Sequence, residues 1–279
     1  MATPLPHVSV ILPARNDAKA LPVSVASALS QRYGGVLDVA IAVGPSEDGT
    51  EEVAHRLAAA HANVTAVANP SGGTAAGLNV ALEVATGDVI VRVDARSQLP
   101  ANYVGTAVEA LRETGAANVG GSQAAAGGTS YERAVAAAMT SRFGVGDAKF
   151  HYGGAAGPTD TVYLGVFDAE VLRSVGAFDE TLGRNQDYEL NWRLREAGHT
   201  VWFEPDLMVA YQPRSSPRAL ASQYFQYGQW KREVARRHPA SLRPRQVVAP
   251  LTLVGVAAGL AGAALGKRWM AAGPAVYGA

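Results

Sequence analysis

The chain lacks cysteine, and it lacks an excess of charge of either sign. Without cysteine, its 279 residues cannot form a disulfide, a thiolate metal site or a thiolate nucleophile. Lysine and arginine together number 24, as do aspartate and glutamate, so the formal net charge is zero. The first residues also lack the basic start and long apolar run of a signal peptide. Aromatic residues are few, at 7%, but 48% of the chain is hydrophobic, which is ample for one large domain with an appendage or for two small domains.

The zero net charge hides an uneven distribution. Between Tyr211 and Arg245, eight basic residues accompany a single acidic one, Glu233, which indicates a local anionic partner. Within this segment, "QYFQYGQWKREVARRH" mixes aromatic residues with cations. The mixture is typical of a helix in a membrane interface, and also of a surface that stacks nucleic-acid bases. A solvated basic helix with its aromatic residues in the core is the third interpretation.

An uncharged apolar run, Val247 to Leu265, follows the basic segment directly. Its length suits one crossing of a bilayer, which takes about 20 residues. The preceding cations are typical of a juxtamembrane segment at an anionic leaflet, although a buried helix rich in alanine and glycine would have a similar composition. We therefore predict a globular domain over residues 1–213, a basic amphipathic segment over 214–245, and a transmembrane segment with its tail over 246–279.

Strands and helices alternate through the first hundred residues. Short apolar runs predict strands near residues 8–14, 37–44, 63–70 and 87–93, and amphipathic runs predict helices over 20–32, 51–61 and 71–85. This alternation predicts a parallel sheet with helices on both faces, whose ligand site lies beyond the carboxyl ends of the strands. Polar residues follow those ends at 15–17, 46–48 and 94–96, so we expect three polar clusters on one rim.

The later part of the chain is less regular. Residues 116–161 are rich in glycine and alanine and are ambiguous, although 129–146 suggests a helix and 151–160 a mobile loop. Residues 161–182 return to a strand and a helix, and 199–213 suggests two short strands. A further helix is expected from Asn185, a suitable N-cap, to just before Gly198. Asp187 then lies in its first turn, which suits either simple charge complementarity with the helix terminus or an ionised general base.

Two other features are consistent with phosphate chemistry. Asp94 ends a buried strand, where an aspartate either caps a turn or binds a divalent cation that bridges a diphosphate. The stretch "SGGTAAGLN" is glycine-rich before a helix and would admit a phosphate at the helix N-terminus, although it matches neither the P-loop nor the dinucleotide fingerprint.

Taken together and in order, the segments "VILPARND", "SEDGT", "GLNVALEVATGDVIVRVDAR", "VGAFDETLGRNQDYELNWRLREAG" and "QYFQYGQWK" resemble a family 2 glycosyltransferase. The resemblance covers Val8 to Arg245 and is strongest to the membrane-associated transferases of succinoglycan-type exopolysaccharide assembly. It implies an α/β GT-A fold, Rossmann-like with a mainly parallel sheet, and an inverting transfer of a sugar from a nucleotide donor.

The resemblance also implies roles for individual residues. Asp187 matches the catalytic base, and Asp94 matches the first aspartate of the Asp-x-Asp motif, which binds the metal and the donor. The implied donor-binding residues are Pro13, Ala14, Arg15, Asn16, Asp48, Gly73, Asn79, Arg92, Asp94 and Arg96. The segment from Gln226 to Trp230 resembles a Gln-x-x-Arg-Trp element, and the implied residues of the acceptor or membrane side are Gln186, Gln226, Gln229, Trp230 and Lys231.

The sequence departs from the family pattern at several of these positions. Arg96 replaces the second aspartate of Asp-x-Asp, so either Asp94 holds the metal with phosphates and water, or Arg96 supplies part of the positive charge. Gln186 replaces the acidic residue before the base. Gly44 and Pro45 stand where acidic residues usually follow the second strand, and Gln229 replaces an arginine, which argues against processive synthesis.

The sequence therefore predicts an inverting glycosyltransferase at the cytoplasmic face of the plasma membrane, anchored by its C-terminal segment. The expected donor is a UDP-linked sugar, the expected cofactor Mg²⁺ or Mn²⁺, and the expected acceptor a saccharide on polyprenyl diphosphate. Two alternatives stay open: transfer to a polyprenyl monophosphate, and a non-catalytic subunit that binds nucleotide sugars or acts as a scaffold. Nucleic-acid binding is disfavoured.

Overall fold

A computed structural model describes residues 4–141, 149–211 and 213–266 of the chain. Its contacts divide the chain into two compact units, Met1–Lys231 and Arg232–Ala279, which are described separately. The predicted boundaries at residues 213 and 245 remain predictions.

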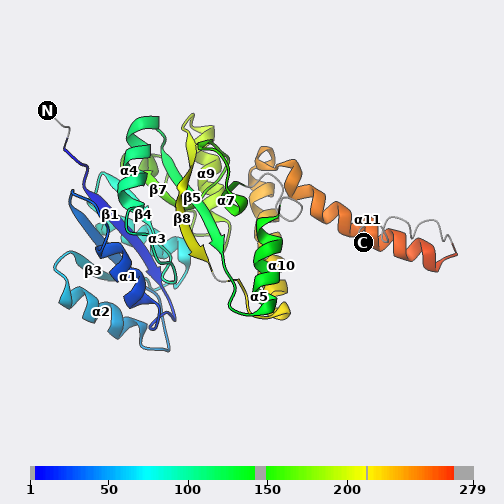
Figure 1. The fold of residues 1–279 in the computed structure, drawn as a ribbon, viewed down its shortest axis with the longest axis horizontal. Coiled ribbons are helices and arrows are strands. Elements are labelled where there is room, and N and C mark those ends of the chain that lie inside the picture. Colours follow the sequence, from blue (N-terminus) through cyan, green and yellow to red (C-terminus); the bar gives the residue numbers. More distant parts are fainter. Residues whose placement is uncertain (1–3, 142–148, 212, 267–279) are drawn as a thin grey trace. The chain divides into compact units, whose positions relative to one another are not determined.

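The first unit begins with the predicted alternation of strands and helices (Figure 1). The strands β1, β2 and β4 are apolar runs that are largely buried on both faces, as strands of a covered parallel sheet are, whereas the edge strand β3 is partly exposed. The elements are β1 (Val8–Ala14), α1 (Leu21–Leu29), β2 (Leu37–Val43), α2 (Thr50–Ala60), β3 (Val64–Ala68), α3 (Thr74–Val84), β4 (Val89–Arg92) and α4 (Tyr103–Thr114).

The second half of this unit contains an element that the sequence did not define. The strand β5 (Asn118–Ala125) occupies the ambiguous glycine-rich region. The helix expected over 129–146 is confirmed in α5 (Ser130–Thr140), whereas residues 142–146 of that prediction lie outside the described residues. The elements α7 (Lys149–Tyr152) and β6 (Gly157–Pro158) follow. The remaining elements are β7 (Tyr163–Asp168), α8 (Ala169–Ser174), α9 (Gln186–Glu196), β8 (Val201–Tyr211) and α10, which spans Pro217–Arg237 and so extends into the second unit.

The eight strands form one sheet in the order β3-β2-β1-β4-β7-β5-β8-β6. The first four are parallel, as expected, but β7 runs antiparallel to both β4 and β5, and β6 runs antiparallel to β8. The sheet is therefore mainly parallel, as predicted, but mixed, because β7 and β6 run against the other strands. The two short strands expected over 199–213 are one strand, β8, which pairs with β5 in two registers separated by an irregularity near Gly121.

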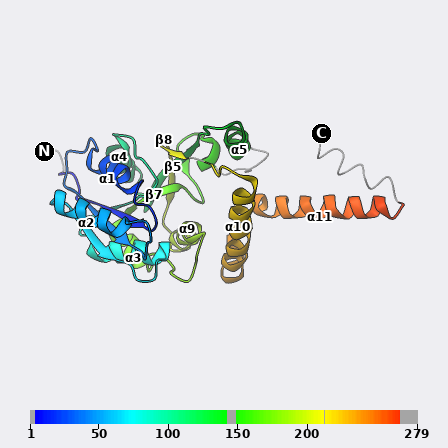
Figure 2. The same cartoon turned by 90° about the horizontal axis from the view of Figure 1, so that it is seen from below.

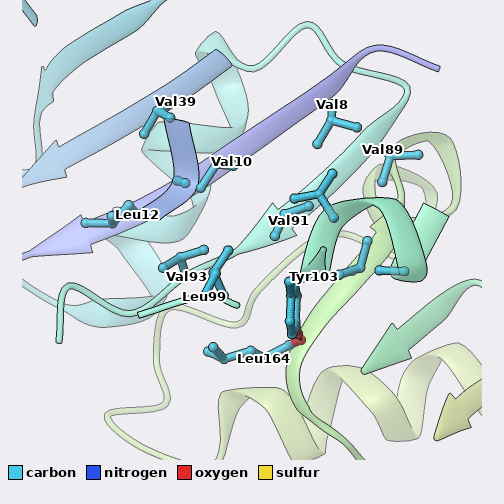
Figure 3. Close-up of a cluster of buried hydrophobic side chains, with 14 of the residues drawn as sticks. Val8, Val10, Leu12, Val39, Val89, Val91, Val93, Leu99, Tyr103 and Leu164 are labelled. Atoms are coloured by element: carbon cyan, nitrogen blue, oxygen red, sulfur yellow. The ribbon is translucent and has the colours of Figure 1, made fainter. Parts of the chain in front are cut away.

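Helices cover both faces of the sheet, which creates two apolar cores. Residues of α1, α2 and α4 pack on one face, and residues of α3, α8 and α9 pack on the other. Figure 2 shows α1 and α4 on one side of the strands and α3 and α9 on the other. Val8, Val10 and Leu12 of β1 lie in the first core (Figure 3), whereas Ile11 enters the second core. The Tyr103 hydroxyl donates a hydrogen bond of 2.7 Å to the Leu164 carbonyl and so fixes β7 to α4.

The second unit contains the end of α10, a short 3-10 helix (Pro239–Ser241) and α11 (Pro244–Ala264). Within α11, Gln246–Ala264 is the one helix among the described residues that is long and apolar enough to cross a membrane. This criterion rests on length and composition alone.

Candidate active site

The loops after β1 and β2 are joined by hydrogen bonds at the carboxyl edge of the sheet. The Asn16 N–H donates to Ser46 Oγ at 3.0 Å, and Asn16 Oδ1 accepts from the Glu47 N–H at 2.9 Å. The Asp17 N–H donates to Thr50 Oγ1 at 2.8 Å. Two of the three predicted clusters therefore form one polar rim.

Asp48 anchors this rim as an ionised carboxylate. Its Oδ1 accepts hydrogen bonds from the Thr50 hydroxyl and N–H, and its Oδ2 accepts one from the Ala18 N–H at 3.0 Å. The bond from the Thr50 side chain, followed by that from Ala18, lowers the pKa of Asp48. Asp48 thus holds the backbone of both loops, and this accounts for its place at the rim.

The third cluster reaches the same rim through Arg96. Its Nε donates to Asp17 Oδ1 at 2.6 Å, and its Nη2 lies 3.4 Å from the Asn16 carbonyl. The Arg96 side chain is nevertheless 67% exposed. The arginine at the second Asp-x-Asp position therefore joins the loops after β1 and β4 and keeps much of its guanidinium in solvent.

Glycines allow the loop after β3 to approach the same place. A Cβ added to Gly72 would lie 3.2 Å from Pro45 Cδ and 3.3 Å from Arg15 Nη1. A cavity of about 310 Å³ adjoins these loops, with walls that include Gly44, Pro45 and Asn69. Its volume is at the lower end of the range for small-molecule sites. The two positions that lack the family's acidic residues thus line this cavity, together with apolar residues and with Glu51 and His55.

A buried arginine at the end of β4 connects Asp94 with Asp187. The Arg92 side chain is only 7% exposed, and its Nη2 lies 2.9 Å from Asp94 Oδ1. Its Nη1 forms an ion pair with Asp187 Oδ1. The carboxylates of Asp94 and Asp187 are 39% and 40% exposed, so both are accessible from solvent while one guanidinium holds them together.

Asp187 lies in the first turn of α9, as predicted, but the helix begins differently than expected. Asn185 occupies the N-cap position with a left-handed φ of 63°, and its side chain caps no helix N–H. Instead its Nδ2 donates to the Tyr227 carbonyl at 3.1 Å. Gln186 is buried, and within the described part of the chain its Oε1 has no hydrogen-bond partner. At the other end, Gly198 adopts a φ of +86° just past the last turn, as predicted.

One face of α10 holds the segment that carries Asp187. Arg184 Nε donates to Gln226 Oε1 at 2.8 Å, and the Trp230 ring lies against Gly183, where an added Cβ would be 2.7 Å from Trp230 Cζ2.

Lys231 Nζ, on the same face, lies 2.8 Å from the centre of the Tyr188 ring. Three of the predicted acceptor-side residues, Gln226, Trp230 and Lys231, therefore contact the segment that carries Asp187, whereas Gln229 is exposed.

Asn79, which is predicted to bind the donor, forms hydrogen bonds with other residues of the chain. Its Nδ2 donates to the Phe178 carbonyl and to Glu180 Oε1, both at 2.8 Å, and its Oδ1 accepts from the Phe178 N–H. These three hydrogen bonds of the Asn79 amide tie α3 to the loop before α9. Gly73 does stand at the N-cap of α3, and Pro13 and Ala14 end β1 at the rim.

Sequence reasoning missed Tyr163, which lies on β7. Burial raises the pKa of its hydroxyl, and the nearby Asp94 carboxylate raises it further, so the phenol stays neutral beside Asp94. The next residue, Leu164, has an unusual φ of 45°. The only signal in the sequence is a tyrosine at a strand start, which is too common to assign.

Within the described ranges, no group of three or more histidine, aspartate or glutamate side chains is arranged to hold a metal ion. Asp94 alone offers a half-exposed carboxylate at the expected place. This fits the mode in which one carboxylate, substrate phosphates and water complete the coordination of Mg²⁺ or Mn²⁺.

Comparison with solved structures identifies the class of fold. The mannosyltransferase PcManGT from Pyrobaculum calidifontis, solved with GDP-Man and Mn²⁺, superposes with a TM-score of 0.73 at 23% identity over 98% of this chain and 79% of its own. S. aureus TarS 1-349 superposes with a TM-score of 0.59 at 17% identity over 82% of this chain and 64% of its own. The fold is thus of the GT-A type.

Sequence comparison identifies the family. The model named Glycosyl transferase family 2 matches residues 9–176. Succinoglycan biosynthesis protein ExoA of Rhizobium meliloti is 33% identical over 85% of this chain and 71% of its own length. Glycosyltransferase AglE of Haloferax volcanii is 26% identical over 91% of this chain and 83% of its own length. The chain belongs to glycosyltransferase family 2.

Proposed function

We propose that the protein is an inverting glycosyltransferase that uses a nucleotide-sugar donor and extends a lipid-linked saccharide. The observation that carries this proposal is the pairing of Asp94 and Asp187 through Arg92, because it brings a donor carboxylate and a base to one place. The similarity to a succinoglycan biosynthesis protein supports polysaccharide assembly as the setting.

In the proposed reaction, an acceptor hydroxyl attacks the anomeric carbon of the donor sugar. The new glycosidic bond forms as the bond to the nucleoside diphosphate breaks, and Asp187 takes the hydroxyl proton. The N-terminus of α9 favours an ionised Asp187. The diphosphate leaves with its negative charge, which the exposed guanidinium of Arg96 helps to compensate at the rim.

A divalent metal held by Asp94 would neutralise part of the diphosphate charge. Arg15, Asn16 and Asp48 build the rim that receives the nucleotide, and the adjoining cavity is proposed for its base. PcManGT was solved with GDP-Man, and TarS with UDP-GlcNAc, so relatives by fold use different nucleosides. We propose a UDP-linked donor, and the experiment below compares it with GDP- and dTDP-linked sugars.

We also propose that the protein acts at the cytoplasmic face of a membrane. This is supported by the apolar helix Gln246–Ala264 and by the basic residues before it. The exposed rings of Tyr224 and Phe225 on α10 support the same view, because aromatic residues suit the membrane interface. The interpretation in which these aromatic residues belong to a core is not supported.

The test is Asp187→Asn, assayed with UDP-, GDP- and dTDP-sugars in the presence of Mg²⁺, Mn²⁺ or chelator. We expect donor affinity to be unchanged and kcat to fall by about 10²–10⁴-fold, the usual contribution of a general base. Glu196→Gln, at the exposed end of the same helix, is the control and should retain full turnover.

Retained transfer in Asp187→Asn would reject the base assignment and favour transfer to a polyprenyl phosphate, whose attacking oxygen is already an anion. Donor binding without turnover under any metal condition would instead favour the non-catalytic subunit.

A further inference from the structure

Arg92 occupies an unusual position for a donor-binding residue. It is the last residue of β4, and its side chain is almost fully buried between the end of the strand and α9. Its Nε is buried and has no hydrogen-bond partner among the residues that the structure describes, so this edge of the guanidinium faces the protein interior. The exposed cations of the site are Arg15 and Arg96 instead.

The two terminal nitrogens of Arg92 point to carboxylates from distant parts of the chain. Nη2 contacts Asp94, two residues along the same segment, and Nη1 contacts Asp187, at the start of α9. A planar guanidinium fixes the angle between two such partners, whereas a lysine ammonium offers a single point of charge. The fork of Arg92 thus sets the separation of the two carboxylates.

We propose that Arg92 is a positioning residue, which fixes the base Asp187 relative to the donor carboxylate Asp94, and that it is not a ligand of the donor phosphates. The proposal rests on the function proposed above. Without Arg92, two partly exposed carboxylates of like charge would face each other and separate. The base would then lie out of line with the anomeric carbon, where displacement of about 1 Å lowers the rate by about 10²-fold.

The kinetic test compares Arg92→Met, Arg92→Lys and the control Arg56→Met, an exposed arginine on α2. Affinity is measured by calorimetry with UDP and GDP in the presence of Mn²⁺, and kcat is measured at saturating donor. We expect Arg92→Met to lower kcat by about 10²-fold with nucleotide affinity within about threefold of the parent. Arg92→Lys should recover less than a tenth of the parent kcat. A large loss of nucleotide affinity with kcat retained would overturn the proposal.

A second measurement does not depend on turnover. Urea unfolding of Arg92→Met, Asp187→Asn and the double variant gives the coupling between the two side chains. We expect a coupling of about tenfold or more in the unfolding equilibrium constant, equivalent to about 1.4 kcal/mol. Additive effects would overturn the proposal whatever the enzyme does. If the parent transfers no sugar, the proposed function fails, and this coupling alone decides whether Arg92 holds Asp187.

Discussion

Gly121 of β5 is a residue that no other amino acid can replace without a shift in the backbone. A Cβ at this position would overlap the Leu207 carbonyl, where β8 crosses between its two registers. We expect Gly121→Ala to lower the free energy of unfolding by about 1–3 kcal/mol, the usual cost of overpacking. Urea denaturation monitored by circular dichroism measures the change.

The matched control is Gly228→Ala within α10, where an added Cβ meets no atom within 4 Å. Alanine loses less backbone entropy than glycine in a helix, so this variant should be more stable by about 0.5–1 kcal/mol. If both substitutions changed the free energy of unfolding by the same amount, the close packing of Gly121 against the Leu207 carbonyl would be contradicted.

At the same scale, the sequence predicted some of the site and not the rest. Asp94 and Asp187 were predictable, because a strand end and a helix start place them by local rules. The bridge through Arg92 could not be predicted, because tertiary packing between β4 and α9 brings its two partners together. The hydrogen bonds of Asn79 could not be predicted for the same reason, since they join residues about a hundred positions apart in the chain.

At the scale of the element, α10 supports the segment that carries Asp187. Trp230 covers Gly183, so its removal leaves a gap beneath the turn that leads into α9. We expect Trp230→Ala to lower kcat on the order of tenfold without changing nucleotide affinity, because the base loses its fixed position. Steady-state kinetics and calorimetry on the same preparation measure both quantities.

Trp230→Phe retains an aromatic ring over Gly183 and should stay within about threefold of the parent kcat. A Trp230→Ala protein with the parent kcat would show that α10 does not position the base. Thermal melting of each variant separates a local effect from loss of the fold.

The elements that could be predicted from the sequence have a clear hydrophobic periodicity and clear turn residues at their ends. Helices α1 to α3 and strands β1 to β4 met both conditions, because apolar runs alternate with turn residues there. The direction of β7 could not be predicted, since periodicity gives burial and not orientation. The pattern of β5, "NVGGSQAA", is too poor in branched residues to indicate a strand, although its position between β7 and β8 makes it one.

At the scale of the whole molecule, the proposed membrane attachment predicts a change in fractionation. Leu253→Arg places a charge near the middle of the apolar helix, where it costs about 2.5–3.5 kcal/mol of insertion free energy. We expect a large share of this variant to move from the membrane pellet to the supernatant after centrifugation of a detergent-free lysate, while nucleotide affinity persists.

Ala59→Arg, at an exposed position near the end of α2, adds the same charge outside the helix and should leave the distribution unchanged. If Leu253→Arg remained in the pellet to the same extent as the parent, α11 would not be the anchor.

The order of strands in the sheet also determines when each strand edge is covered during synthesis on the ribosome. β4 pairs with β1 on one side, but its other neighbour, β7, begins only at Tyr163. β5 is made in between, and both of its neighbours follow it in the chain. From residue 92 until residue 168 has emerged, the nascent chain therefore carries an apolar strand with an open edge, the kind of surface that recruits other chains. The half-made protein, rather than the finished one, is the form most exposed to aggregation.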